Sequence, residues 1–567
     1  MQYKELCNVY EKLEATKKGL EKTKILSEFL HNAKKELELI YLLQGRIFPD
    51  YDTREIGISE QTVIKAIAKT SGVDEKEVVK KFKEKGDLGK AACEILKSKK
   101  QSSLFSKNLT TEKVLSNLRK LPEMEGKGTV DNKIGLIVEL LHSATPNEAK
   151  YVIRTLLGDL KVGTGNGLIR DSIIDFCFHP KDIAEKKEKS ELVQSAYDKS
   201  TDFAEVFEKA CSNKLHDISL SPGKPVKVML FPKAHDIADA FEIVGKPAAF
   251  EFKYDGFRML INKDEKGVIK IFTRRLENVS NQFQDAEKYA RENISANSFI
   301  IDCEAVGFNP KTKKYMPFQD ISQRIKRKYD IEQLEKELPI ELNVFDILYY
   351  NGKTLINTPF KDRRKIIEKI IKEVPFKIRL AEQIITDNEK EAQKFYDKDL
   401  KEGQEGLMGK SLEGIYKPGA RVGFGVKIKP EAEEFDLVIT GAEWGTGKRA
   451  GWLTSFDVSC IDKRTSQLLE IGKVSTGLKE KPEEGFSFEE LTNILKKLKL
   501  KEDAEGKHMI VKPEIVITVG YQDIQRSPTY TSGFALRFPR FKALRPDRSV
   551  SDIASVEEVR KEAGKKK

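Results

Sequence analysis

The stretch AAFEFKYDGFRMLIN, residues 248–262, decides how the rest of the chain is interpreted. Its apolar and aromatic residues are typical of buried β-strands, and the Asp-Gly pair inside it predicts a tight turn. Lys253 lies just before this turn, between two aromatic residues. A lysine in such a strand either extends its ammonium group to solvent or stays partly desolvated, which favours loss of its proton and nucleophilic use. The stretch therefore predicts β structure and a candidate nucleophile together.

Further strand-like segments follow this stretch and alternate with helical ones. The strand-like segments are VIKIFTRR, SFIIDCEAVGF and ELNVFDILYY, and DRRKIIEKIIKEV has helical spacing. This alternation predicts a mixed α/β domain over residues 221–430.

The two ends of the chain have patterns of apolar residues that differ from that of the central domain. In residues 1–220 apolar side chains recur every three or four positions, as in Leu26, Phe29, Leu30 and Ala33, which predicts an all-helical domain. In residues 431–567 the segments FDLVIT, TSFDVSCID, LLEIGKVS and EIVITVGYQDI are separated by polar turns, which predicts an OB-fold β-barrel followed by a charged helix or tail. The expected fold is therefore multidomain α+β.

Composition narrows the class of protein. The 567 residues are 39% hydrophobic and 34% charged, which fits several folded domains with charged surfaces. No uncharged apolar segment approaches the roughly 18 residues of a membrane helix, so we expect a cytoplasmic protein. The six cysteines contain no CxxC pair, which argues against a structural zinc site. The net charge of +11 suits a phosphate-bearing partner but does not establish one.

Several short motifs follow EFKYDGFR in order: IFTRRLENVS, IDCEAVGF, NVFDILYYNG, EGLMGKSL, GVKIKPEA and LRFPRFKALRPDRSV. In GVKIKPEA, Lys427 and Lys429 alternate with Val426 and Ile428, so strand geometry places both ammonium groups on one face. Each motif alone occurs by chance, whereas the ordered series does not.

This series resembles the ATP-dependent DNA ligases, most closely the archaeal replicative type, from about Asp87 to Asp552. The resemblance implies a helical DNA-binding domain, an adenylation (nucleotidyltransferase) domain and an OB-fold domain. It implies an enzyme that seals nicks in duplex DNA through a lysyl-AMP intermediate and a 5′-adenylated DNA intermediate, in replication, repair and recombination. ATP and Mg²⁺ are the implied cofactors, with Mn²⁺ as a substitute.

The same resemblance implies roles for individual residues. Lys253 receives AMP, Phe345 stacks on adenine, and Glu304 and Glu405 bind the metal ion. The residues implied in ATP binding are Glu251, Arg258, Arg274, Glu304, Phe345, Arg421, Lys427 and Lys429. The residues implied in contact with DNA or pyrophosphate are Arg540, Arg545, Asp547 and Arg548, of which Arg548 stands where the family usually has lysine.

Two glycine-rich stretches lack the full spacing of a phosphate-binding P-loop. GTGNG at 163–167 resembles the family's turn whose backbone amides meet DNA phosphates, although a plain turn has the same composition. GTGK at 445–448 lies in the expected barrel, where Lys448 and Arg449 are candidate DNA contacts.

A basic, serine-containing break between helical segments resembles the short clamp-binding motif of archaeal ligases. Its candidate residues are Gln101, Leu104 and Phe105. The alternative is a loop that packs Phe105 onto its own domain. The partners expected are therefore nicked double-stranded DNA and a sliding clamp of the PCNA type, bound by a monomer.

Two other functions remain open at this point. One is an RNA ligase or capping-type nucleotidyltransferase, a class that generally lacks the large helical domain. The other is a catalytically dead, clamp-associated DNA-binding scaffold, against which the intact motif residues argue. Incubation with labelled ATP separates a live enzyme from a scaffold.

Overall fold

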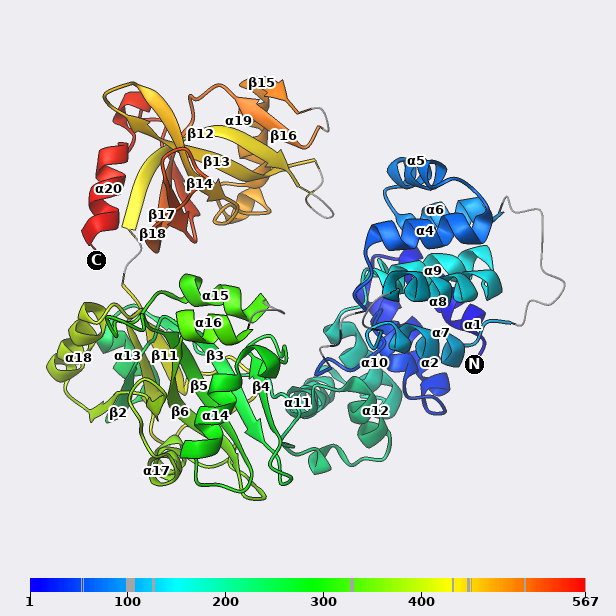
Figure 1. Cartoon of the computed structure of the whole chain (residues 1–567), viewed down its shortest axis with the longest axis horizontal. Helices are drawn as coiled ribbons and strands as arrows, with labels where there is room; N and C mark the ends of the chain where they lie inside the picture. Colours follow the sequence, from blue (N-terminus) through cyan, green and yellow to red (C-terminus); the bar gives the residue numbers. More distant parts are fainter. Residues whose placement is uncertain are drawn as a thin grey trace. The chain divides into compact units, whose positions relative to one another are not determined.

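The structure is a computed structural model of the chain that describes residues 1–52, 54, 56–97, 108–124, 128–326, 331–430, 433–445, 449, 451–503 and 506–565. It divides into two compact units, Met1–Ile428 and Lys429–Lys567. The first unit has a helical region followed by a mixed α/β region, and the second is rich in β-strands (Figure 1). The expectation of a multidomain α+β fold is therefore confirmed.

The helical region begins the first unit. Its elements are α1 (Tyr3–Ala15), α2 (Gly19–Ala33), α3 (Leu39–Leu43), α4 (Glu60–Ser71), α5 (Glu75–Lys85), α6 (Leu88–Lys97), α7 (Thr111–Lys120), α8 (Thr129–Ser143), α9 (Pro146–Leu156), α10 (Asn166–Cys177), α11 (Ile183–Ser200), α12 (Phe203–Cys211) and the 3₁₀ helix η1 (Leu215–Asp217). The periodic face of α2 is buried at Leu26, Phe29, Leu30 and Ala33, as predicted. Among the helices described here, none is long and apolar enough to cross a membrane.

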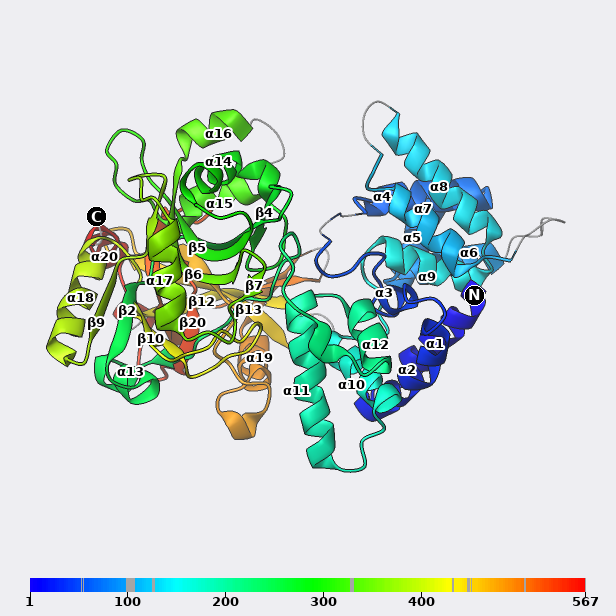
Figure 2. The same cartoon turned by 90° about the horizontal axis from the view of Figure 1, so that it is seen from below.

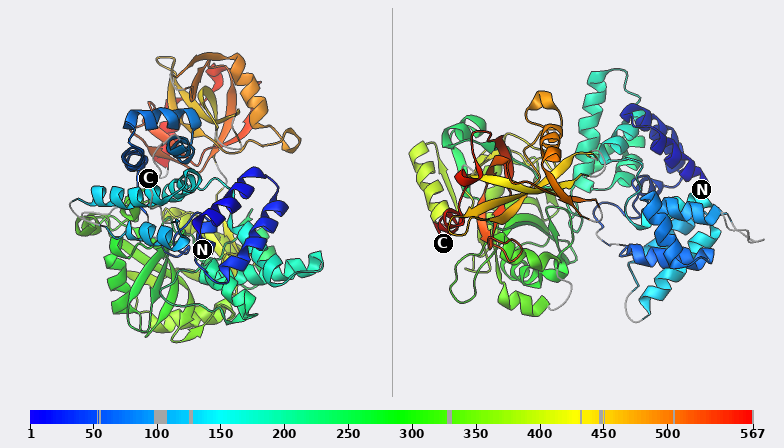
Figure 3. Two further views of the ribbon diagram at one scale, coloured as in Figure 1. Left: turned by 90° about the vertical axis from the view of Figure 1, so that its right-hand side faces the viewer. Right: turned by 90° about the horizontal axis from the view of Figure 1, so that it is seen from above.

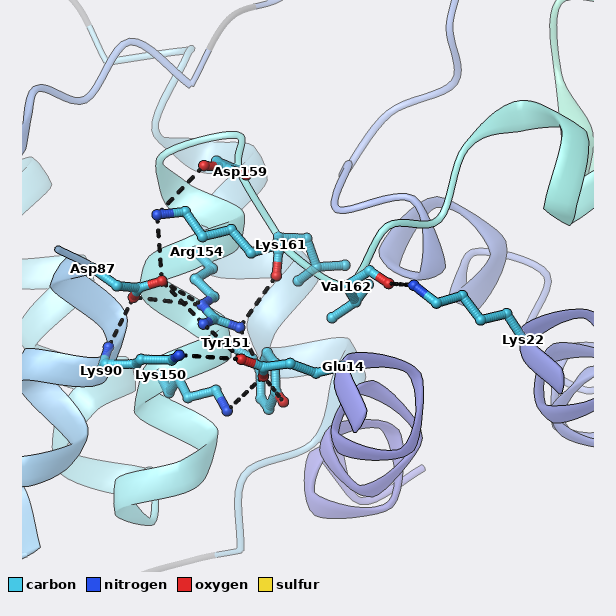
Figure 4. A network of polar contacts seen from close by, with 11 residues as sticks. Glu14, Lys22, Asp87, Lys90, Lys150, Tyr151, Arg154, Asp159, Lys161 and Val162 are labelled. Atoms are coloured by element: carbon cyan, nitrogen blue, oxygen red, sulfur yellow. Dashed lines mark hydrogen bonds and ion pairs between the residues drawn. The ribbon is translucent and has the colours of Figure 1, made fainter. Parts of the chain in front are cut away.

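An ion network joins the helices of this region (Figure 4). The buried guanidinium of Arg154 on α9 donates to Asp87 Oδ2 at 3.0 Å and to Glu14 Oε2 at 3.1 Å. Lys150, one turn away, pairs with Glu14 at 2.9 Å. Gly89 on α6 lies so close to α9 that a Cβ there would be 2.5 Å from the Lys150 carbonyl oxygen. The network and this close approach hold α1, α6 and α9 together.

The α/β region contains, within the described residues, a five-stranded and a six-stranded sheet. The strands of the five-stranded sheet, in order, are β1 (Lys233–Ala234), β11 (Gly425–Ile428), β10 (Leu407–Ser411), β2 (Ala248–Phe252) and β9 (Gln383–Thr386). The six-stranded sheet has the order β4 (Ile269–Thr273), β3 (Phe257–Lys263), β5 (Phe299–Gly307), β6 (Ile340–Tyr350) and β7 (Lys353–Thr354), and β8 (Ile378–Leu380) also pairs with β6.

Helices cover these sheets and bury one face of each. They are α13 (Ile237–Val244), α14 (Gln284–Asn293), α15 (Phe318–Lys326), α16 (Ile331–Glu337), α17 (Phe360–Ile370) and α18 (Glu389–Lys401), with the 3₁₀ turn η2 (Ser280–Gln282). Apolar residues of α13 and α18 share a core with β2, β10 and β11. Those of α14 and α17 share a core with β3, β5 and β6, and α17 lies along β6 (Figure 2).

Within the described residues, the second unit has a seven-stranded antiparallel sheet and a separate two-stranded one. Its elements are β12 (Glu433–Trp444), β13 (Leu453–Asp462), β14 (Gln467–Val474), η4 (Pro482–Glu484), α19 (Phe488–Lys497), β15 (Lys499–Glu502), β16 (His508–Val511), β17 (Val516–Tyr521), β18 (Asp523–Arg526), β19 (Phe534–Arg537), β20 (Arg540–Leu544), η5 (Val550–Asp552) and α20 (Val556–Lys565). The long strand β12 pairs with β13 along one edge and with both β16 and β17 along the other. The helices α19 (orange) and α20 (red) lie against these strands (Figure 3). Their apolar residues belong to the core of this unit. The segments predicted as strands are strands.

The ion network gives the helical region a pH dependence. Burial raises the pKa of Glu14, but hydrogen bonds from Arg154 and Lys150 outweigh burial and lower it to about 2. Because the folded-state pKa is depressed, this stabilisation is present above the ordinary glutamate pKa of about 4.3 and is lost as the pH falls towards 2.

We expect Glu14→Gln to remove part of this acid sensitivity. Hydrogen exchange of the α1 and α9 amides in urea, measured between pH 5 and pH 2, reports the local free energy of unfolding. The variant should lose less stability than the parent across this range, while the exposed control Glu28→Gln should follow the parent. Parallel curves for Glu14→Gln and the parent would contradict this account.

Candidate active site

Lys253 lies in the loop between β2 and β3, at the point where two distant chain segments pair. Its backbone N–H donates to the Gly406 carbonyl oxygen at 2.8 Å, and the Glu405 N–H donates to the Lys253 carbonyl oxygen at 2.8 Å. The side chains of Lys253 and Glu405 form an ion pair. The Lys253 side chain is 21% exposed, so a substrate can reach a partly buried amine.

The rest of the KYDG sequence holds this loop in place. The Tyr254 hydroxyl accepts a hydrogen bond from the Glu382 N–H at 3.0 Å, and the Asp255 N–H donates to Gln404 Oε1 at 3.0 Å. A Cβ at Gly256 would lie 2.4 Å from the Ala305 carbonyl oxygen of β5. Glycine is therefore required because the loop presses against a neighbouring strand.

Glu304 brings a second carboxylate to the loop. It lies on β5, directly opposite Arg258 on β3. Burial raises the pKa of Glu304 to about 7. The negative charges of Asp302 and Glu405 add to this increase, and the positive charges of Lys253 and Arg258 oppose it. A carboxyl group of this kind changes protonation near neutral pH, and its charged form gains stability from a bound cation.

The two carboxylates of Glu304 and Glu405 are the hard oxygen donors at this site. Across the described part of the chain, no group of three or more His, Cys, Asp or Glu side chains forms a metal cage. Magnesium usually binds through one or two carboxylates plus substrate phosphates, so a two-carboxylate site suits it when a nucleotide is present.

Arg258, next to the site, is held by hydrogen bonds to other parts of the protein. Its Nε donates to Asp302 Oδ1 at 2.7 Å and its Nη1 to the Met229 carbonyl oxygen at 3.0 Å. The Tyr416 hydroxyl donates to Asp302 Oδ2 at 3.0 Å, so the carboxylate is shared. Burial lowers the pKa of Arg258, but the Asp302 charge outweighs burial and raises it. Most guanidinium donors are therefore occupied, which limits direct contact of Arg258 with a nucleotide.

Phe345 occupies a β-bulge of β6, where the register against β5 shifts between Asp302 and Cys303. A bulge redirects a side chain. The Phe345 ring joins the core of the five-stranded sheet, while Val344 before it joins the core of the other sheet. Phe345 therefore links the two sheets at the site.

Glu251 and Lys427 face the same side of the five-stranded sheet. Met408 on β10, the strand between β2 and β11, pairs directly with both. Its partner on β2 is Glu251, and its partner on β11 is Lys427. The side chains of Val426 and Ile428 point into the core on the other side, so the predicted alternation holds within β11. Lys429 follows β11 as the first residue of the second unit.

The remaining predicted arginines are at the surface or in ion pairs. Arg274 lies exposed in the turn after β4, and Arg421 is exposed beside a backbone bridge to Leu230. In the second unit Arg545 donates to Asp547 at 2.9 Å and to Asp436 at 2.9 Å. Arg548 lies 3.6 Å from Asp436, and Arg540 is exposed at the start of β20.

The glycine-rich stretch GTGNG forms an exposed turn that leads into α10. The Thr164 hydroxyl donates to the Leu43 carbonyl oxygen at 2.8 Å, and α10 begins after Gly165 with no side-chain cap. In the GTGK stretch Lys448 lies outside the described residues, while Arg449 pairs with Glu480 at 2.8 Å. The clamp-motif candidates Gln101, Leu104 and Phe105 also lie outside the described residues.

Sequence reasoning missed several residues that shape the site. They are Asp399, Lys410, Tyr416, Gln383, Arg363 and Arg364. Lys410 follows Met408 by two positions in a strand, so alternation places it on the same face as Met408. The pairing of Met408 with Glu251 makes this the face of Glu251 as well. The others reach the site through contacts across long sequence separations, for which the sequence contains no local signal.

Fold and site together are those of a nucleotidyltransferase. Three family models match the chain: DNA ligase N terminus at residues 2–174, ATP dependent DNA ligase domain at 228–429, and ATP dependent DNA ligase C terminal region at 449–548. The DNA ligase of Nanoarchaeum equitans is 44% identical, over 99% of this chain and 98% of that protein. The DNA ligase of Thermococcus fumicolans is 40% identical, over 99% of this chain and 98% of that protein.

A solved structure named Pmar-Lig_PreS3 has the same fold, with a TM-score of 0.56 and 18% identity over 95% of this chain and 99% of that chain. From the family models and the full-length relatives, the chain belongs to the ATP-dependent DNA ligases of the archaeal type. The predicted family is confirmed, and the RNA ligase and capping-type alternatives are not favoured.

The close approach at Gly256 gives a testable consequence. Gly256→Ala should displace the Lys253 loop, because the new methyl group would overlap the Ala305 carbonyl oxygen. A displacement of about 1 Å lowers the rate of an oriented reaction by roughly 100-fold. We expect a loss of this order in the initial rate of covalent AMP labelling. Gly135→Ala on α8, where a Cβ meets nothing within 4 Å, is the matched control. Labelling of Gly256→Ala at the control rate would contradict this account.

Proposed function

We propose that this chain seals nicks in duplex DNA by moving AMP from ATP, through Lys253, to the 5′-phosphate of the nick. The observation that carries the proposal is the placement of the Lys253 amine in a partly buried loop beside the Glu405 and Glu304 carboxylates. Membership of the ATP-dependent DNA ligases supports the choice of ATP and of a nick as substrates.

In the first step the Lys253 Nζ attacks the α-phosphorus of ATP and pyrophosphate leaves. The amine must lose a proton to do so, and the ion pair with Glu405 holds it at the site until the nucleotide binds. Lys427 and Lys429 supply positive charge to the α-phosphate as negative charge develops there. Phe345 stacks on adenine, and Glu251, on the same sheet face as Lys427, meets the edge of the base.

In the second step AMP moves from Lys253 to the 5′-phosphate of the nick. In the third step the 3′-hydroxyl attacks this phosphate and AMP leaves, which forms the phosphodiester bond. Each step is a displacement at phosphorus, so positioning and charge neutralisation supply most of the catalysis. Lys427, Lys429 and the carboxylates of Glu304 and Glu405 therefore serve all three steps.

Magnesium would be held by Glu304 and Glu405 together with the nucleotide phosphates. When bound, it neutralises phosphate charge and aligns the leaving group. Mn²⁺ has the same preference for oxygen ligands and would substitute.

The chain organisation proposed for this function is a helical DNA-binding domain at 1–220, an adenylation domain at 221–430 and an OB-fold domain at 431–567. The mostly exposed residues of the GTGNG stretch and the uncapped start of α10 support contact with DNA phosphates. Arg540 and the cluster of Arg545, Asp547 and Arg548 are proposed to meet DNA or pyrophosphate, and Arg274 and Arg421 to meet the nucleotide. We place the enzyme in the cytoplasm as a monomer.

Separating the steps tests the proposal. Lys253→Ala should form no covalent AMP adduct and should not seal an ordinary nick with ATP, because the nucleophile of the first step is missing. It should still seal a nick supplied with a 5′-adenylated end, because the third step uses the DNA 3′-hydroxyl as nucleophile. Gel separation of labelled substrate and product measures both activities. A Lys253→Ala protein that still forms the adduct would refute the assignment.

A sliding clamp of the PCNA type is the proposed protein partner, through Gln101, Leu104 and Phe105. A glutamine and two apolar side chains in a short segment suit a clamp pocket, and tethering raises the effective concentration of enzyme at nicks. Leu104→Ala with Phe105→Ala should abolish binding to the clamp in a pull-down and leave clamp-free sealing unchanged. Unchanged clamp binding, or an equal loss of clamp-free sealing, would assign these residues to the fold instead.

A further inference from the structure

Lys410 is a buried cation with no part in the proposed transfer of AMP. It lies on β10 and is 5% exposed. It pairs directly with Ala249 of β2, two positions from the pair of Met408 with Glu251, so Lys410 and Glu251 are diagonal neighbours on one sheet face. A lysine is rarely buried unless it is paired, so its contacts identify its role.

The ammonium group of Lys410 contacts one carboxylate and two aromatic rings. Its Nζ lies 2.5 Å from Glu251 Oε2. It also lies 4.7 Å from the centre of the Phe345 ring and 4.5 Å from that of Phe360. The ion pair lacks the geometry of a directed hydrogen bond, and no hydrogen-bond acceptor for this ammonium is present among the described residues. The cation therefore joins the proposed base-stacking ring to Glu251.

Glu251 is 2% exposed, and donors converge on it from three directions. Gln383 Nε2 donates to its Oε1 at 2.8 Å, and Arg364 Nη1 lies 3.5 Å from the same oxygen. Of these three contacts only that from Gln383 is a hydrogen bond, and a carboxylate has about four acceptor sites, so acceptor sites remain on Glu251. A cation lies beside each of its two oxygens, and a carboxylate offers acceptors only.

We propose that Lys410 is a positioning residue that holds Glu251 to accept a hydrogen bond from the 6-amino group of adenine, and that it thereby helps to select ATP as the AMP donor. The inference rests on the proposed function, in which Phe345 and Glu251 meet the base. The 6-amino group of adenine is a donor, whereas guanine has an acceptor oxygen at this position. An acceptor-only carboxylate beside the stacked ring therefore favours adenine there.

Removing Lys410 takes away the cation that holds the Glu251 carboxylate in place. A buried carboxylate without this cation is costly, so we expect Glu251 to turn towards its remaining partners, Gln383 and Arg364. A carboxylate turned away from the base no longer distinguishes a 6-amino donor from the absence of one. Lys410 also touches the Phe345 ring, so its loss loosens the alignment of ring and acceptor.

A comparison of two nucleotides isolates the 6-amino contact. The probes are ATP and the triphosphate of purine riboside, which lacks the 6-amino group, and the readout is the second-order rate constant for covalent adduct formation with the full-length enzyme. A hydrogen bond to a charged acceptor should give the parent enzyme a preference for ATP of ~10-fold or more. Lys410→Met should reduce this preference to below ~3-fold. Lys410→Arg, which keeps the charge, should restore part of it.

Two further variants separate positioning from folding. Lys361→Met removes a partly exposed cation paired with Glu413 and should keep the full preference for ATP. The double variant Glu251→Gln with Lys410→Met removes both buried charges at once, which proteins often tolerate better than the loss of one partner. It should have the same preference as Glu251→Gln alone, because Lys410 acts through Glu251.

Each outcome decides the inference. It is overturned if Lys410→Met slows both nucleotides equally and keeps the ratio, or if the double variant loses more preference than Glu251→Gln alone. Equal rates for the two nucleotides in the parent enzyme would also overturn it, while leaving the proposed function intact. A parent enzyme that forms no adduct with ATP would instead refute the proposed function.

Discussion

The active site depends on one short antiparallel pairing between segments that are far apart in sequence. The hydrogen bonds that link Lys253 to Glu405 and Gly406 bring the nucleophile and a carboxylate to the same point. Asp399 at the end of α18 supports this pairing, because its Oδ2 accepts a hydrogen bond from the Gly406 N–H at 2.6 Å. Burial raises the pKa of Asp399 to about 8, which the hydrogen bonds to backbone amides oppose. The buried side chain of Asp399 therefore fixes the position of the loop that carries Glu405.

Charges buried in pairs are the second constraint. Arg258 with Asp302, Arg363 with Asp346, and Lys410 with Glu251 each place a cation and a carboxylate in the core behind the site. Such pairs often contribute little net stability compared with apolar residues, but loss of one partner leaves an uncompensated charge. The contacts within these pairs instead fix where neighbouring groups lie. Arg363, for example, donates to the two oxygens of Asp346 at 2.7 Å and 3.0 Å.

Much of the fold was predictable because local patterns determine it. The alternation around Lys427 and the apolar segments around residue 253 appear as β11, β2 and β3. The pattern of α2 predicted its buried face because helical spacing needs only neighbours in sequence. Gly256 was recognised as a turn residue, but its physical reason, the Ala305 carbonyl oxygen, comes from a strand about 50 residues away. The Phe345 bulge likewise depends on the register with β5, and no feature of β6 alone indicates it.

The central claim is that Lys253 carries the AMP. It is tested most directly by incubating the full-length enzyme with ATP and Mg²⁺, digesting it and locating the modification by mass spectrometry under conditions that preserve a phosphoramidate bond. The account predicts one AMP per chain, bound through phosphorus to Nζ of Lys253. AMP on any other residue, such as Lys427 or Lys410, or the absence of a covalent adduct, would contradict it.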